Sequence, residues 1–179
     1  MAHGVKPPVD LARPEDHLGM RRSRELKPLS SEHHQALLVA FQLKKGVEGH
    51  AESAGAPKDL PGLGSLARRF GDHVLKTHAR AEEDLLCDIL LAPDLTRLRA
   101  EHVEMFRLLD LARTAPPAEL RAHLIAFADL VERHVRWEER EVFPYAEQHV
   151  DGPTLARIGG ELERRLVLGR TEAKATRPR

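Results

Sequence analysis

A short pattern of histidine and glutamate occurs twice in this chain and constrains its fold more than any other feature. Residues 78–83 read His-Ala-Arg-Ala-Glu-Glu, and residues 134–139 read His-Val-Arg-Trp-Glu-Glu. A Glu-His pair precedes each copy, at residues 32–33 and 101–102. Positions four apart lie on one face of a helix, about one turn apart. Each copy therefore predicts a helix that directs one imidazole and one carboxylate toward the same point.

The side chains that this pattern aligns are the candidate metal ligands. Each lies on a helix stripe among leucines, and such a stripe is expected to face the interior of a helical bundle. Burying an ionised carboxylate or an unpaired imidazole there is costly, even after the protein relaxes. Two metal ions would supply the counter-charge, because carboxylates can bridge two cations while imidazoles cap each one. The predicted ligands are His33, His78, Glu82, His102, His134 and Glu138.

The predicted ligand set also narrows the choice of metal and of protein class. Imidazole and carboxylate without thiolate suit iron, manganese or zinc. Two imidazoles per metal with bridging carboxylates leave positions open for a small ligand, which at iron favours redox or gas chemistry. Ferritin-like di-iron proteins place Glu-x-x-His on two helices, whereas here histidine precedes glutamate by four. The His-Glu-x-x-His motif of metalloproteases does not occur in the sequence either.

Composition excludes several other classes of protein. The chain has 28 basic and 28 acidic residues, so its charge favours neither nucleic acid nor an anionic membrane as a partner. Aromatic residues, at 4%, are too scarce for a base-stacking platform. Cys87 is the single cysteine, which excludes a disulfide framework and favours a cytoplasmic protein. No apolar run approaches the ~20 residues that span a bilayer, and the N-terminus lacks the apolar core of a signal peptide.

Helical periodicity predicts an all-α chain with an arm, a bundle and a tail. Residues 1–27 contain prolines and little periodicity, which is typical of a flexible arm. Residues 28–150 are predicted to form four helices, near 31–46, 63–91, 94–113 and from 118 onward. Their short loops favour an up-down-up-down four-helix bundle, and Pro144 is expected to kink or shorten the last helix. Residues 151–179 are predicted to form a short extra helix, to about residue 168, and a loose basic tail.

Taken together, these residues resemble the hemerythrin-like, or HHE cation-binding, family. The resemblance covers about residues 28–150 and rests on the pattern above, on Leu-Ser-Ser-Glu-His-His at 29–34 and on Val-Phe-Pro at 142–144. It implies a bundle that holds a non-haem di-iron centre, with carboxylate and oxide bridges. His33 and His102 would be the lone ligands of their helices, and Glu82 and Glu138 the bridging carboxylates. Manganese or zinc in place of two iron ions stays an alternative.

The resemblance leaves the completion of the coordination open. Oxygen-carrying hemerythrins have a fifth imidazole four residues after the histidine of the third helix, where this chain has Phe106. Storage of dioxygen is therefore not the expected role. His34, His73 and Tyr145 are candidates to complete the coordination. A register shift of one residue would instead make Glu139 the bridging carboxylate.

Three neighbours of the predicted ligands receive plainer interpretations. Glu83 and Glu139 follow the predicted bridging residues directly, and we expect them at the surface or beside the site, paired with Arg80 or Arg136. Cys87 lies five residues after Glu82, off the ligand stripe, and is expected to be a buried, inert thiol.

The resemblance implies a protein that binds iron and, through it, dioxygen, peroxide or nitric oxide in a bacterial stress response. Any enzymatic activity would be a redox one, such as turnover of peroxide or nitric oxide. The sequence shows no arrangement of a nucleophile with a base and no pocket for an organic substrate. Two alternatives stay open: an iron store or donor for iron–sulfur cluster repair, and a structural helical bundle without metal. No nucleic acid or membrane partner is expected, and a protein partner cannot be named.

Overall fold

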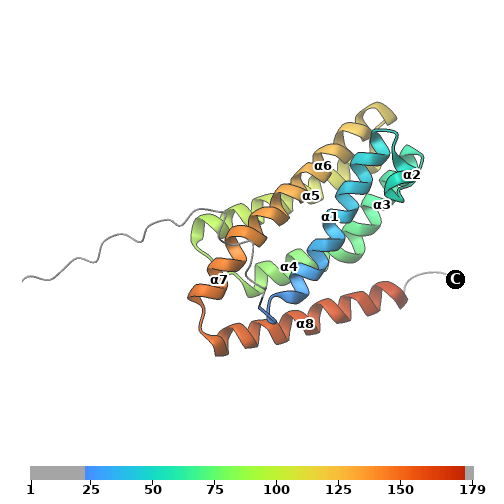
Figure 1. The fold of residues 1–179 in the computed structure, drawn as a ribbon. Helices are drawn as coiled ribbons and strands as arrows, with labels where there is room; N and C mark the ends of the chain where they lie inside the picture. The colour runs from blue at the N-terminus through green and yellow to red at the C-terminus, as the bar shows by residue number, and fades with distance from the viewer. Residues whose placement is uncertain (1–22, 176–179) are drawn as a thin grey trace, which may run out of the picture.

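This chain folds into antiparallel helices. The computed structural model describes residues 23–175, and their side chains up to residue 166. Figure 1 shows long helical segments packed side by side, and four of them confirm the predicted all-α, up-down-up-down bundle. The first and third segments are α1 (Lys27–Val47) and α5 (Ala92–Thr114). The second and fourth are composite, and each is formed by two helices in succession.

Each composite segment contains one π-helical turn. In the second, α3 (Leu60–Phe70) continues through η2 (Gly71–Leu75) into α4 (Lys76–Leu85). In the fourth, α6 (Pro117–Trp137) continues through η3 (Glu138–Val142) into α7 (Phe143–His149). Pro144 lacks the N–H that an α-helix would bond to residue 140, and the wider π turn ends just before it. The helix was predicted to kink or to end early at Pro144. Instead, it contains a π turn before Pro144 and continues to His149.

The connection between the first two segments is more structured than predicted. A short helix, α2 (Ala51–Ala54), lies within the predicted loop and ends at Gly55, whose φ of 60° suits glycine. Asp59 then caps α3, because its Oδ1 accepts a hydrogen bond of 2.6 Å from the Gly62 N–H. The second helix of the bundle therefore begins at Leu60 and its α4 part ends at Leu85, earlier than the predicted end near residue 91.

A fifth helix, α8 (Gly152–Ala175), confirms the predicted extra C-terminal helix and continues past the predicted end near residue 168. It lies along one side of the bundle, beside α4 and the start of α1 (Figure 1). The predicted flexible arm also ends earlier than expected. Leu26 is fully buried, and the Ser23 N–H donates to Glu147 Oε1 at 2.8 Å. The rest of the predicted arm, residues 1–22, lies outside the described residues.

Two apolar clusters fill the interior, one toward each end of the bundle. The first contains the later part of α1 with α3, the second half of α5 and most of α6. The second contains the residues around the start of α1, parts of α4, α5 and α7, and the apolar face of α8. On each of the four bundle segments, the predicted metal ligands lie where one cluster gives way to the other. The six candidate ligands therefore form a polar layer between two apolar cores.

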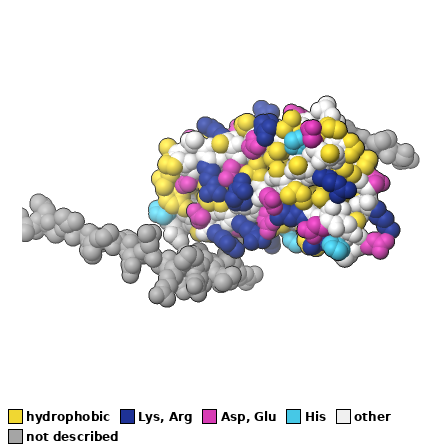
Figure 2. Space-filling model, turned by 90° about the horizontal axis from the view of Figure 1, so that it is seen from above, with side chains coloured by type: hydrophobic (Ala, Val, Ile, Leu, Met, Phe, Trp, Pro, Cys, Tyr) yellow, Lys and Arg dark blue, Asp and Glu magenta, His cyan; other side chains and the backbone are white. Residues whose placement is uncertain are grey.

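The surface is mixed in charge, as the balanced composition predicts. Figure 2 shows one face, on which basic and acidic side chains lie close together and apolar side chains gather over part of the area. The large apolar side chains that are exposed among the described residues are Leu38, Phe41, Leu91 and Val103. No helix within the described ranges is both long and apolar enough to cross a membrane.

Candidate metal centre

All six predicted ligands meet in the middle of the bundle. His33 comes from α1, His78 and Glu82 from α4, and the remaining three from α5, α6 and η3. All six are buried, and Glu82 and Glu138 have no exposed surface at all. They form two groups, in each of which the potential ligand atoms lie within 4.8 Å of one another. The groups are His33, His78, Glu82 and Glu138, and Glu82, His102, His134 and Glu138.

The two carboxylates belong to both groups, as bridging ligands would. Glu82 Oε1 lies 3.1 Å from His78 Nε2, and its Oε2 lies 3.4 Å from His102 Nε2. Glu138 Oε2 lies 3.1 Å from His33 Nε2 and 3.4 Å from His134 Nε2. Each carboxylate therefore lies beside one histidine of the first group and one histidine of the second. The carboxylate that faces the Nε2 atoms in the fourth segment is Glu138, and Glu139 does not take this place.

These inward-facing atoms approach one another without forming hydrogen bonds. Among the described residues, no hydrogen-bond partner exists for either oxygen of Glu82 or Glu138, or for the Nε2 atoms of His33, His102 and His134. Buried polar atoms are nearly always paired, and an unpaired one costs about 1–3 kcal/mol. Seven such atoms, all without a hydrogen-bond partner among the described residues, surround the same point. Cations between them would satisfy the nitrogen lone pairs and the carboxylate oxygens together.

The outer nitrogen of every candidate histidine binds a further glutamate. His33 Nδ1 lies 2.8 Å from Glu139 Oε1, and His102 Nδ1 lies 2.8 Å from Glu83 Oε1. A carboxylate can only accept a hydrogen bond, so Nδ1 carries a proton, and in the neutral imidazole, the form that binds metal, Nε2 then keeps its lone pair free. In metal sites this kind of partner fixes the tautomer and the orientation of the ring. The predicted pairing of Glu83 and Glu139 with Arg80 or Arg136 is wrong, because both carboxylates bind histidine instead.

Two further glutamates hold the remaining histidines, and the sequence reasoning assigned them no role. His78 Nδ1 lies 3.1 Å from Glu32 Oε2, and His134 Nδ1 lies 2.8 Å from Glu101 Oε2. Glu32 and Glu101 are the glutamates of the two Glu-His pairs, so each supports the histidine of the next helix in the chain. The sequence feature that could have indicated this role is the recurrence of the Glu-His pair before both copies of the pattern. The contacts themselves join different helices, and the periodicity of a single helix does not predict them.

The electrostatics of the centre favour protonated histidines when no metal is bound. Burial alone would lower the pKa of His33, but the carboxylates of Glu138 and Glu139 outweigh it and raise that pKa well above its usual value. Burial likewise opposes protonation of His78, yet Glu82 and Glu32 raise its pKa to about 9. Protons on the histidines therefore offset the carboxylate charge, and a metal ion would have to displace them.

The second group of ligands follows the same balance. The pKa of His102 is raised, because the nearby Glu82 and Glu83 carboxylates outweigh the effect of burial. Burial would raise the pKa of Glu82, but the imidazoles of His78, His102 and His33 hold it well below the usual range. The bridging position of Glu82 is therefore occupied by a carboxylate anion, the form that binds metal.

None of the other candidates for completing the coordination lies in the centre. His34 and His73 are exposed on the bundle surface. Tyr145 stacks on His149, with 4.2 Å between the ring centroids. Phe106, at the position of the missing fifth imidazole, packs against the first apolar cluster. Cys87 is partly exposed and not buried as predicted, and residual burial together with Asp88 raises the pKa of its thiol.

A small cavity adjoins the inner face of the centre. Its volume is about 20 Å³, and on this scale one water molecule needs about 10–15 Å³. Glu32, His33, His78 and His134 form its polar side. The rest of its wall is apolar and includes Ala36, Phe70, Val74, Leu75, Met105, Val131 and Val135. The cavity therefore has room for one very small molecule next to three of the candidate ligands.

The π turn η3 lies between a candidate ligand and an aromatic residue that contacts the centre. Glu138 is its first residue, and Phe143 follows its last. The Phe143 ring stacks on the His33 ring, with 5.3 Å between centroids and 5° between planes. A π turn adds a residue to the helix and so rotates everything after it by about 100°. Glu138 points inward because it follows His134 by four residues, and the turn after it brings Phe143 onto the imidazole of the first helix.

Comparison with protein families agrees with this geometry. The family described as "Hemerythrin HHE cation binding domain" matches residues 27–146, and it matches a second time over residues 93–164. The chain belongs to this family. The second match begins near the start of α5, the helix that opens the second copy of the hemerythrin-type pattern. Comparison with curated proteins and with solved structures found no matching protein.

Membership of the hemerythrin HHE family and the buried histidine–glutamate groups both indicate metal binding. The family is named for cation binding, and the groups offer imidazole and carboxylate atoms within reach of one ion each. The protein is therefore a metal-binding helical bundle in its general character.

Proposed function

We propose that the protein holds two iron ions in the polar layer of the bundle and that they react with a small oxidant or diatomic gas. One ion would bind to His33 and His78, the other to His102 and His134, with Glu82 and Glu138 bridging them. The observation that carries this proposal is the set of buried, unpaired inward atoms, which two cations would satisfy. Bound iron would supply the redox chemistry that these side chains lack. Manganese or zinc would fit the same ligand types.

The protein's own residues would prepare the site in three ways. The outer glutamates hold each imidazole with its lone pair directed inward. The two apolar clusters on either side exclude bulk water from the ions. The cavity beside His33, His78 and His134 admits one small molecule of the size of dioxygen, nitric oxide or peroxide. A sensor, scavenger or redox enzyme of oxidative or nitrosative stress would need these features.

The first experiment is the metal content of untagged protein after anaerobic loading with Fe²⁺, with absorption spectra before and after oxidation. We expect about two irons per chain and visible bands upon oxidation. The double variant Glu82→Gln/Glu138→Gln should lose both, while the exposed Glu104→Gln should keep both. Circular dichroism would verify that each variant is folded. Folded wild-type protein that binds no iron, manganese or zinc would refute the proposal and leave a structural bundle.

A second experiment tests whether the cavity is where the small ligand binds. Ala36 lines the cavity and is buried, so Ala36→Leu should fill it without removing a ligand. We expect this variant to keep its iron but to respond more slowly to nitric oxide or peroxide in the visible spectrum. Ala112→Leu adds the same volume to the first apolar cluster away from the cavity and is the control. Equal rates in the two variants would contradict a role for the cavity.

The alternative of an iron store or donor predicts a different result. A donor must release its metal readily, so a chelator should remove iron from it within minutes. The complete burial of both bridging carboxylates favours retention over release. Fast loss of iron, together with spectra that do not respond to any oxidant or gas, would favour the donor role.

A further inference from the structure

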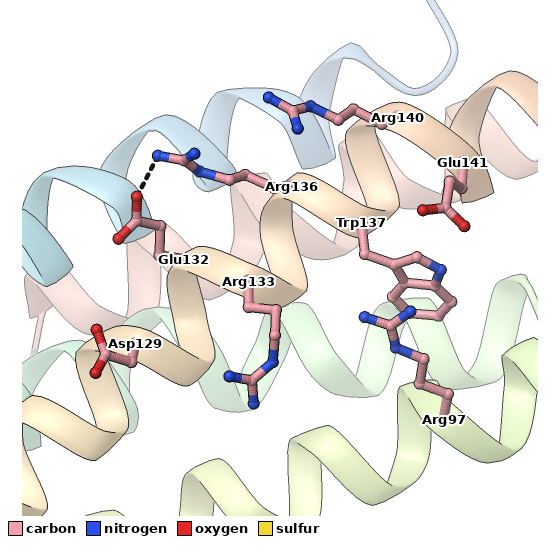
Figure 3. Close-up of a pocket in the computed structure, with 8 residues that line it drawn as sticks. All are labelled: Arg97, Asp129, Glu132, Arg133, Arg136, Trp137, Arg140 and Glu141. Atoms are coloured by element: carbon pink, nitrogen blue, oxygen red, sulfur yellow. Dashed lines mark hydrogen bonds and ion pairs between the residues drawn. The ribbon is translucent and has the colours of Figure 1, made fainter. Parts of the chain in front are cut away.

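A groove on the outside of the bundle lies next to the metal centre but contributes no metal ligand. It runs between α5 and α6 and has a volume of about 580 Å³, within the usual range for sites of small ligands. Figure 3 shows Arg97 on α5 and Arg133 and Trp137 on α6, with Arg133 extending toward the helix that carries Arg97. Arg140, from η3, lines it as well.

Arg97 is held in place but keeps its main binding edge free. Its Nε donates to Glu101 Oε1 at 3.0 Å, and its Cζ lies 4.1 Å from the centroid of the Trp137 ring. Among the described residues, its two Nη atoms have no hydrogen-bond partner. A guanidinium fixed by stacking loses little freedom when it binds a ligand, and its paired N–H groups match the oxygens of phosphate or carboxylate.

The acidic side chains of the groove are largely bound already. Lys44 Nζ lies 2.6 Å from Asp129 Oδ1 and 2.5 Å from Glu132 Oε2. Arg136 also pairs with Glu132 (Figure 3). These acids and bases neutralise one another along the side of the groove next to α1. They leave the remaining charges of the groove to act on a ligand.

The remaining charges are mostly positive. Within the described part of the chain, Arg133 and Arg140 have neither a hydrogen bond nor an ion pair. The acid without such a partner in the groove is Glu141, at the end near Trp137 (Figure 3). Arg97 and Arg133 therefore offer two guanidinium groups to the same space, and a ligand that satisfies both carries negative oxygens.

We propose that this groove is a binding site for a small oxyanion, a phosphate or a carboxylate, held by Arg97 and Arg133. The anion would accept hydrogen bonds from the free Nη edge of Arg97 while the Nε of that residue stays on Glu101. Trp137 would form the floor beneath the guanidinium. None of the six candidate metal ligands takes part in this site.

The groove is also connected to the metal centre, and this step rests on the proposed function. Glu101 receives Arg97 on Oε1 and His134 on Oε2, at 3.0 and 2.8 Å. The ring of Trp137 lies 6.0 Å from that of His134. An anion on Arg97 would offset its positive charge, so Glu101 would become a stronger acceptor for His134. His134 would then be a better donor to iron, and the ferric state would be favoured.

The site can be tested on metal-free, full-length protein with inorganic phosphate as the probe. Trp137 is the single tryptophan of the chain and lines the groove, so tryptophan fluorescence comes from one residue beside the proposed site. Phosphate is titrated at a constant ionic strength of about 0.15 M, with chloride as the matched salt, and calorimetry provides a second readout. We expect saturable binding that Arg97→Gln and Arg133→Gln each weaken at least about fivefold. Arg99→Gln, an exposed change on the same helix, should bind like wild type.

Further measurements identify the source of the oxyanion and the connection to the metal. A nucleoside monophosphate that binds more tightly than inorganic phosphate, and depends equally on Arg97, would indicate a phosphoester ligand. Weaker binding would indicate a free anion. Calorimetry that shows no binding beyond chloride, or equal binding by wild type and Arg97→Gln, would overturn the proposal.

In iron-loaded protein, phosphate should lower the reduction potential in wild type and not in Arg97→Gln. Arg97→Lys, which keeps the charge, should restore part of the effect. Protein that binds phosphate but no iron would refute the proposed function and leave the anion site standing.

Discussion

The metal-facing histidines depend on carboxylates that hold their outer nitrogens. Replacing Glu101 by glutamine keeps the size of the side chain but removes the charge that orients His134. Loss of such a partner typically reduces metal affinity about 10–100-fold, and we expect this for Glu101→Gln and for Glu83→Gln. Anaerobic titration with Fe²⁺ against a competing chelator measures the change. Glu104→Gln on the same helix is the control, and an affinity for Glu101→Gln equal to that of the control would contradict the assignment.

Raised histidine pKa values predict how the metal-free protein responds to pH. His78 titrates near 6.5 when unfolded and at about 9 when folded. Its contribution to stability is therefore complete below pH 6.5 and is lost as the pH rises to 9, a change on the order of 3 kcal/mol. His33 and His102 are shifted in the same direction and add to the loss. Urea unfolding of metal-free protein should show a falling midpoint across this window.

The iron-loaded protein is the internal control for this pH dependence. Metal takes the place of the protons, so the stability of the iron-loaded protein should not fall between pH 6.5 and 9.

The lowered pKa of Glu82 acts in the acid range of the metal-free protein. The contribution of Glu82 to stability is present above about pH 4.5 and is lost as the pH falls further. An unfolding midpoint of metal-free protein that stays constant from pH 6.5 to 9 would show that the histidines are not held protonated.

The meeting of the six candidate ligands could be predicted from the sequence, and their outer partners could not. His78 and Glu82 are four residues apart on one helix, so their common direction follows from helix geometry alone. The contact between Glu139 and His33 joins the first and fourth segments, 106 positions apart. Such a contact depends on how the helices are rotated against each other. The assignment of Glu139 to an arginine failed for this reason.

At the scale of whole elements, helix content was predictable and the π turns were not. Apolar periodicity marks the long helices because burial of one face stabilises each of them. A π turn has no such period, and η2 carries no proline to indicate it. In η3 the nearby Pro144 predicted a disturbance without predicting its form. The turn η3 matters for the site, because it sets the direction of Phe143, which stacks on His33.

The docking of α8 leads to a test with two adjacent glycines. A Cβ on Gly159 would lie 2.7 Å from the Glu25 Cα, whereas a Cβ on Gly160 would have no atom within 4 Å. Gly159→Ala should therefore destabilise the protein by about 1–3 kcal/mol, because backbone must move. Gly160→Ala should stabilise it by up to about 1 kcal/mol through helix propensity. Urea unfolding of both variants decides this, and equal effects would show that α8 does not pack closely at Gly159.

At the scale of the whole molecule, the polar layer divides the interior into two cores. The first apolar cluster and the second are each buried, but the residues between them are ionisable. Without metal, the buried ionisable side chains of this layer lower the free energy of unfolding, and the apolar packing of the two cores must compensate for that loss. The arrangement of α8 and the groove beside Trp137 could not be predicted from the sequence, because both depend on how complete helices pack. The layer itself could be predicted, since each of the four bundle segments carries one or two candidate ligands on its inward face.

Metal binding should therefore stabilise the entire bundle. A ligand at 1,000 times its dissociation constant adds about 4 kcal/mol per site to the free energy of unfolding. Two filled sites in a chain of this size should raise the melting temperature by about 15–30 °C. Calorimetry of anaerobic protein with and without Fe²⁺ measures this shift, and Glu82→Gln/Glu138→Gln should abolish it while staying folded. If a chelator that demonstrably removes the iron leaves the melting temperature of wild-type protein unchanged, the metal does not lie in the polar layer, because ions bound there must stabilise both cores.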